Sequence, residues 1–121
     1  MIGDIGKLLT EIIEDETVAL SQNTYREIVE NTPVDTGHAV SNWILSKNKP
    51  FPDVVGSKTA VNHRKSLDSL SEIQNYKVKD GSIFLTNNVN YVPILNEGSS
   101  TQAPAGFVQI GMDRAIEKTK S

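Results

Sequence analysis

One short motif in this sequence combines residue types that could carry out catalysis: Asp35-Thr36-Gly37. Two aspartates that approach to about 3 Å share one proton, because both cannot ionise, and such a pair can activate a water molecule. This chain has one such triplet, so a second subunit would have to supply the second aspartate. The motif therefore allows a small dimeric hydrolase that uses Asp35.

The surroundings of the triplet favour a structural role instead. In aspartic proteases the triplet lies in an all-β fold, whereas here a long predicted helix leads directly into it, and the second apolar strand signature is missing. Asp35 can cap a helix, Thr36 can make a side-chain turn bond and Gly37 can supply a flexible backbone. We predict that the chain is not an enzyme, with an aspartic-protease-like hydrolase as the alternative.

The remaining candidates for chemistry are two histidines, His38 and His63. Neither lies in a motif for a nucleophile, a metal or a phosphate. The sequence has no cysteine, which excludes disulfides, thiolate metal sites and cysteine nucleophiles. The sequence therefore predicts no cofactor and no metal.

The 121 residues are enough for one domain, which we assign to residues 1–121. A net charge of −3 and an aromatic fraction of 6% argue against sequence-specific nucleic-acid binding. No apolar run reaches 18 residues and no signal-cleavage pattern is present, so we expect neither a membrane span nor a leader.

Charge is distributed unevenly along the chain. Residues 1–30 carry seven acids and two bases, whereas residues 47–65 carry five bases and one acid. Opposite potentials of this kind could steer identical subunits together, although two separately solvated faces would give the same pattern.

The hydropathy pattern predicts an α+β fold, in which a long N-terminal helix and further helices pack on a small, mostly antiparallel sheet. Apolar residues with a 3.6-residue period predict the long helix over residues 4–30, interrupted by acids that should face water: Glu14, Asp15 and Glu16. The other predicted elements are a short helix at 37–42, a strand starting at 43–45, a helix at 60–74, a hairpin of 76–80 with 82–87, a helical turn at 91–95 and a final helix at 107–118.

Two segments, 46–59 and 96–106, lack the periodicity of a core element and contain prolines and glycines. We predict that both are loops that take part in assembly. Trp43 is predicted to anchor the core, and Asn87 to take part in a turn. Glu97 is less easily explained by local structure, and could bind a neighbouring loop or subunit.

Three segments in a fixed order carry a resemblance to a known family. They are Thr-Pro-Val-Asp-Thr-Gly at 32–37 followed by Ser-Asn-Trp at 41–43, then Ser-Ile-Phe-Leu-Thr-Asn-Asn-Val-Asn-Tyr at 82–91, then Leu-Asn-Glu-Gly-Ser-Ser-Thr-Gln-Ala-Pro-Ala-Gly-Phe-Val at 95–108. After a long N-terminal helix, this set resembles the small neck and tail-completion proteins of tailed bacteriophages. The resemblance covers nearly the whole chain.

The resemblance implies a structural virion protein at the head–tail junction. Such proteins form a homo-oligomeric ring, expected here as a hexamer with a dodecamer as the alternative, and DNA passes through the lumen without sequence-specific binding. The implied partners are the head connector or stopper protein, the tail tube or sheath protein and, as a further candidate, the tape-measure protein. The implied location is the virion neck, and the host cytoplasm during assembly. A generic oligomeric interaction module is a second alternative.

The resemblance marks a set of positions as structural. They are Pro33, Asp35, Thr36, Gly37, Trp43, Asn87, Tyr91, Glu97, Gly98, Gln102, Pro104 and Gly106. In a ring that surrounds DNA, an acidic lumen would repel the passing phosphates, and the candidate lumen acids are Glu14, Asp15 and Glu16.

Overall fold

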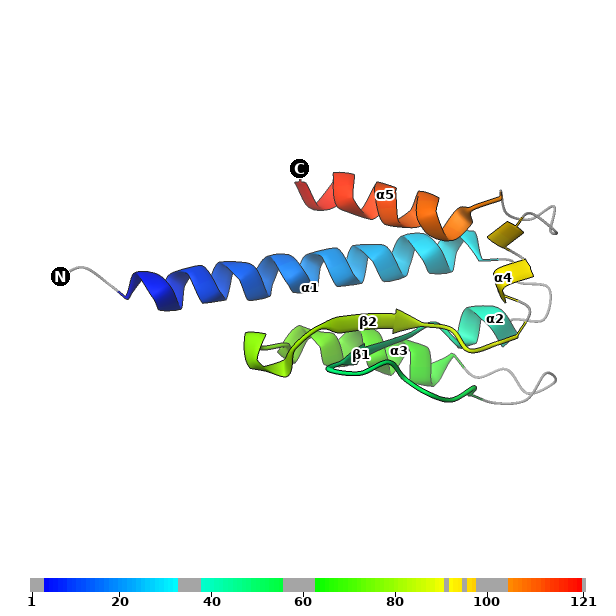
Figure 1. Ribbon diagram of the computed structural model, residues 1–121, viewed down its shortest axis with the longest axis horizontal. Coiled ribbons are helices and arrows are strands. Elements are labelled where there is room, and N and C mark those ends of the chain that lie inside the picture. Colours follow the sequence, from blue (N-terminus) through cyan, green and yellow to red (C-terminus); the bar gives the residue numbers. More distant parts are fainter. Residues whose placement is uncertain are drawn as a thin grey trace.

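One long helix, α1 (Ile5–Asn31), runs along the greater part of the molecule (Figure 1). This computed structural model describes residues 4–32, 38–55, 63–90, 92–94, 96–97 and 105–120. Asp4 caps the start of α1, because its Oδ1 accepts a hydrogen bond of 3.0 Å from the Lys7 backbone N–H. The helix ends at Thr32, whose extended backbone is the geometry favoured before a proline. The predicted N-terminal helix is therefore confirmed.

The other elements lie on two sides of α1. Helix α5 (Phe107–Lys120) runs antiparallel to α1 along one side, and α3 (Arg64–Glu72) lies with the two strands on the other (Figure 1). The described residues also include four short helical segments: α2 (His38–Ser41), η1 (Ile73–Asn75), η2 (Val78–Asp80) and α4 (Val92–Ile94). The predicted α+β fold is confirmed.

Among the described residues the sheet has two antiparallel strands, β1 (Ile44–Lys47) and β2 (Ile83–Thr86). Leu45 lies opposite Leu85, and Lys47 lies opposite Ile83. Directly opposite residues share a face of the sheet, so Leu45, Leu85 and Ile83 lie on one face together with Lys47.

The predicted hairpin of 76–80 with 82–87 is wrong, because β2 pairs with β1 and residues 78–80 form the turn η2. Two backbone N–H groups in this segment are bound by side chains instead of by a strand. The Lys77 N–H donates to Asp80 Oδ2 (2.9 Å), and the Val78 N–H donates to Glu14 Oε2 of α1 (2.8 Å). The Lys77 N–H also lowers the pKa of Asp80 below its ordinary value.

Other boundaries differ in smaller ways from those predicted. Helix α3 is shorter than the predicted 60–74, although residues 60–62 lie outside the described residues. The predicted loop 46–59 begins inside β1, and its described part from 48 to 55 has neither helix nor strand. That part is held by side chains, since the Val55 N–H donates to Asn42 Oδ1 (2.6 Å) and Asn88 Nδ2 donates to Phe51 O (2.7 Å).

The apolar core lies between the C-terminal half of α1, the sheet, α3 and the start of α5. Its buried members are Tyr25, Ile28, Ala39, Trp43, Leu45, Ile73, Val89, Val92 and Phe107. Trp43 is thus a core anchor, as predicted.

Helices α1 and α5 approach closely at Gly111. A methyl group at this position would lie 2.8 Å from Ile28 Cγ1 and 3.3 Å from the Ile28 backbone nitrogen. Ile28 is buried (2% exposed), so its side chain has little room to shift, and the contact with its backbone nitrogen is also tight. The absence of a side chain at Gly111 therefore permits the two helices to pack this closely.

We predict that Gly111→Ala lowers the free energy of unfolding by about 1–3 kcal/mol, because overpacking separates the two helices. The matched control is Gly6→Ala, at which the added methyl has its nearest atom at 3.4 Å. That control should raise stability by about 0.5–1 kcal/mol through helix propensity. Urea unfolding followed by circular dichroism measures both, and equal effects of the two substitutions would contradict the packing argument.

Candidate assembly surfaces

The first part of α1, residues 5–13, carries an exposed apolar stripe, and we call this segment the α1 tip. Its large apolar side chains are between 45% and 63% exposed: Ile5, Leu8, Leu9, Ile12 and Ile13. Their spacing of three and four residues places them on one side of the helix. Contiguous exposed apolar surface of this kind marks interaction sites in soluble proteins.

The tip is exposed because the neighbouring elements are too short to cover it. Helix α1 has 27 residues and α5 has 14, which correspond to about 40 Å and about 21 Å of helix. Helix α5 starts beside the C-terminal end of α1 and runs backward. Thr119 in its last turn accepts a hydrogen bond from Asn23 Nδ2 (3.0 Å), and its last residues line a pocket with Leu20 and Glu16, so α5 ends short of residues 5–13. Figure 1 shows the first turns of α1 extending past the end of α5 and past the sheet.

The exposed stripe continues the same side of α1 that α5 covers. Asn23 and Glu27 contact α5, through Thr119 and through an ion pair with Lys118. Ile12 precedes Asn23 by 11 residues, which is three helical turns, so both residues lie on one line along the helix. The tip is therefore an uncovered extension of a helix–helix packing face.

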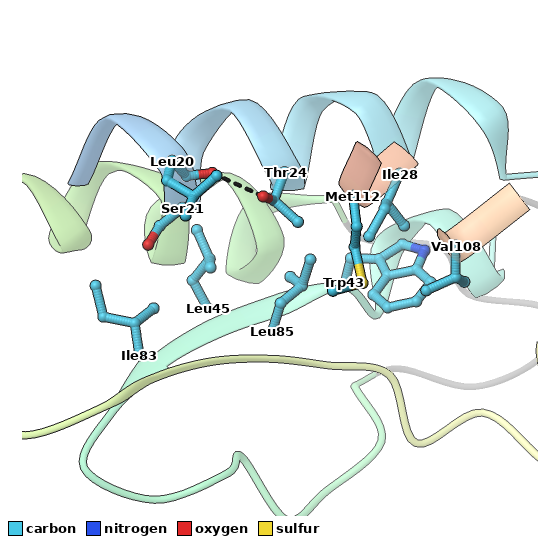
Figure 2. A pocket seen from close by; sticks show the side chains of 10 residues that line it. All are labelled: Leu20, Ser21, Thr24, Ile28, Trp43, Leu45, Ile83, Leu85, Val108 and Met112. Atoms are coloured by element: carbon cyan, nitrogen blue, oxygen red, sulfur yellow. Dashed lines mark hydrogen bonds between the residues drawn. The ribbon is translucent and has the colours of Figure 1, made fainter. Parts of the chain in front are cut away.

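A second apolar surface is a groove between α1, the sheet and α5, with a volume of about 300 Å³. Figure 2 shows the ten lining side chains. They include Leu20 and Ile28 from α1, Leu45, Ile83 and Leu85 from the strands, and Met112 from α5. Leu20 and Met112 are 37% and 46% exposed and form its rim. We call this surface the groove.

Trp43 forms one end of the groove and is held there by hydrogen bonds. Its Nε1 donates to Thr32 Oγ1 (2.8 Å), and the Thr32 hydroxyl donates to the Ile28 carbonyl (2.7 Å). Both residues are buried, at 5% and 3% exposure. The indole is thus fixed to the last turn of α1.

Two buried serines of α3 fix the position of β1 against α1. Ser66 Oγ donates to the Trp43 carbonyl (2.6 Å), and Tyr25 OH lies 2.5 Å from Ser66 Oγ. The Leu45 N–H donates to Ser69 Oγ (3.0 Å). Burial raises the pKa of Tyr25 above its ordinary value, which keeps this hydroxyl protonated as a donor.

The three candidate lumen acids do not share one face of α1. Successive helical residues are about 100° apart, so Glu14, Asp15 and Glu16 point in three directions. Glu14 is half-buried, bound to the Val78 N–H of its own chain, while Asp15 and Glu16 are exposed. Glu14 is thus partly shielded, against the expectation that all three face water.

Four of the twelve positions marked by the family resemblance lie within the described residues. Asn87 takes part in a turn, as predicted, since its Oδ1 accepts from the Val89 N–H (3.1 Å) and its Nδ2 donates to the Ala39 carbonyl (2.7 Å). Trp43 is in the core, Glu97 is exposed, and Gly106 has a φ of +74°, which favours glycine. The others lie outside the described residues: Pro33, Asp35, Thr36, Gly37, Tyr91, Gly98, Gln102 and Pro104.

Sequence reasoning missed Asn96, which joins the described part of the loop 96–106 to α5. Its Oδ1 accepts from the Val108 N–H (3.0 Å), its carbonyl accepts from the Gly106 N–H (2.5 Å) and its Nδ2 donates to Gln109 Oε1 (3.1 Å). The bond from Val108 satisfies an N–H in the first turn of α5. An asparagine 11 residues before a helix carries no local signal for this role.

The described residues bring together few polar side chains that could bind a metal or catalyse a reaction. They contain no cluster of three or more histidine or acidic side chains that could hold a metal ion. None of the described helices is both long enough and apolar enough to cross a membrane.

The groove is lined by apolar side chains together with the hydroxyls of Ser21 and Thr24, and no titratable side chain is among its described lining residues.

Comparison of the chain with protein-family models, with curated proteins and with solved structures finds no match.

We predict that Ser66→Ala lowers the free energy of unfolding by about 1–3 kcal/mol, because the buried Trp43 carbonyl and Tyr25 hydroxyl lose their common partner. Ser71→Ala, on the exposed side of the same helix, is the matched control and should change stability by less than about 0.5 kcal/mol. Denaturant unfolding measures both. A loss at Ser71 as large as at Ser66 would contradict the role assigned to these bonds.

Proposed function

We propose that this chain is a structural subunit of a tailed-phage neck. In this proposal copies of the chain form a ring, of six or twelve subunits, that completes the tail and joins it to the head connector, with DNA passing through the lumen. The single observation that supports an assembly role is the exposed apolar stripe of the α1 tip. The resemblance of three ordered sequence segments supports the neck as the place of assembly.

The α1 tip favours assembly because exposed apolar surface is costly in water. Covering one leucine or isoleucine side chain contributes about 1.5–3 kcal/mol, and the tip presents five such side chains within nine residues. A binding partner that covers the stripe recovers this free energy. An assembly subunit therefore accounts for a feature that works against a free monomer.

The groove gives little support to an enzymatic alternative. General acid–base or nucleophilic catalysis needs titratable groups within hydrogen-bond distance of a substrate, and the described lining of the groove supplies only two hydroxyls. The hydrolase alternative rests on Asp35, which lies outside the described residues. No enzymatic step and no cofactor form part of the proposal.

The exposed acids of α1 fit passage of DNA in this proposal. Asp15 and Glu16 are exposed, and a carboxylate in the lumen would repel the DNA backbone and not bind it. Glu14 contributes less to such a lumen, because it is already bound to η2.

The proposal predicts that the purified protein forms a closed ring as concentration rises. Native mass spectrometry should give six or twelve copies, and negative-stain electron microscopy should show an annulus. Leu8→Gln with Ile12→Gln should lower the association constant by about a hundredfold or more, since two apolar contacts are lost. Thr10→Gln is the matched control on another side of the same turns. A strict dimer or a persistent monomer would contradict the ring.

A second test separates a neck subunit from a generic interaction module. Antibody labelling of phage particles that contain the chain should mark the head–tail junction, and the gene should lie among portal, capsid and tail genes. If the chain is absent from the particles, or if its gene lies in an unrelated neighbourhood, a role as a neck subunit is excluded.

A further inference from the structure

We propose that adjacent copies of this chain associate head to tail, with the α1 tip of one copy seated in the groove of the next. This inference rests on the proposed ring and names the contact that builds it. The occupant of the groove is then a second copy of the same chain.

A subunit cannot fill its own groove with its own tip. Leu20, on the rim of the groove, and Leu8, in the tip, belong to the same continuous helix. Twelve residues separate them, which is about 18 Å along the helix axis. The helix would have to break and reverse to bring the tip into the groove, so only another molecule can supply it.

The two surfaces match in chemistry and in size. The tip presents aliphatic side chains, and the groove is lined by the aliphatic residues Ile28, Leu45, Ile83 and Leu85 with Met112 at its rim. A volume of about 300 Å³ equals that of about ten water molecules at roughly 30 Å³ each. It can therefore receive a few aliphatic side chains from one face of a helix, and not a whole helix.

The charge distribution favours docking of the tip in the groove over packing of two tips together. The α1 tip itself carries one acid and one base, but acids flank it on both sides, so that residues 4–16 together carry five acids and one base. Two tips packed together would bring these flanking acids near one another. The other elements that form the groove, β1, β2 and α5, carry four bases and two acids. Lys47 and Lys120 are among these bases, with side-chain exposures of 36% and 69%, and each lies within 4 Å of an acid of its own chain, Asp80 and Glu117. The acids that flank the tip thus meet a surface whose net charge is opposite to theirs.

The placement of the two surfaces also sets the symmetry of the assembly. The tip and the groove occupy different stretches of α1, so each copy donates one tip and accepts another. A contact of this heterologous kind can be repeated from copy to copy, and it closes into a ring when the rotation between neighbours divides a full turn, or otherwise continues as a filament. This is the symmetry that the proposed neck ring requires.

A cross-linking experiment tests the contact directly, because the native chain has no cysteine. We expect an equimolar mixture of Leu9→Cys and Met112→Cys proteins to form a disulfide-linked heterodimer under mild oxidation. Thr10→Cys mixed with Met112→Cys is the matched control and should give about tenfold less product, because its thiol is not held near the groove. Equal yields in the two mixtures, or cross-linking of Leu9→Cys chiefly to itself, would overturn the inference.

A complementation experiment distinguishes this contact from tip-to-tip packing. Leu9→Glu alone and Met112→Glu alone should each stay monomeric, since each lacks one half of the contact. Their equimolar mixture should form a heterodimer, because an intact tip and an intact groove remain. Both positions are exposed, so circular dichroism should show the wild-type fold. Self-association of Met112→Glu as strong as that of the wild type, or a mixture that stays monomeric, would overturn the inference.

The outcomes keep the inference apart from the proposed function. If the wild-type protein forms a ring but the Leu9→Cys and Met112→Cys proteins form no disulfide with each other, the head-to-tail contact is overturned and the ring remains. A heterodimer in the mixture without a wild-type ring would support the contact and contradict the neck ring.

Discussion

The difference in length between α1 and α5 is the constraint on which the arrangement of surfaces depends. Helix α5 starts beside the C-terminal end of α1, runs antiparallel to it and stops after 14 residues, whereas α1 extends over 27 residues. Where they overlap, Gly111 allows close packing and a core forms. Where they do not, the same side of α1 stays apolar and uncovered. The same helix therefore packs in the core of the domain over one part of its length and presents an exposed apolar stripe over the other.

Hydrogen bonds from buried hydroxyl groups help to hold the small sheet against the helices of this domain. The described sheet has only two strands of four residues each, and two-stranded sheets are marginal without support. Ser66 and Ser69 supply that support by bonding backbone groups next to and within β1, and Thr32 fixes the Trp43 indole. These bonds are specific in direction, so they set where the strand lies as well as how strongly it is held.

The sequence predicted those elements whose signal is local and failed where long-range pairing decides. The 3.6-residue period marked α1 and α5 correctly, and the single tryptophan was placed in the core. The segment 76–80 alternates like a strand, yet Asp80 and Glu14 bind its N–H groups, the second from 64 residues away. The apolar period of the tip could not show whether it faced a core, since periodicity is the same for a covered and an uncovered stripe. The groove was not predictable either, because four elements distant in sequence, α1, β1, β2 and α5, form it.

The exposed tip also has a consequence for how the chain moves before it meets a partner. Residues 5–13 are held mainly by hydrogen bonds of their own helix, and Gly6 in the first turn weakens that helix further. Their amide hydrogens therefore exchange with solvent through local fraying, which needs far less free energy than opening the turns clamped between α5 and the sheet. A segment that is fully ordered only when it is covered gives up conformational entropy at the moment of contact. In the proposed assembly, each contact is then weaker than its apolar area suggests, and a misplaced subunit can dissociate before the ring closes.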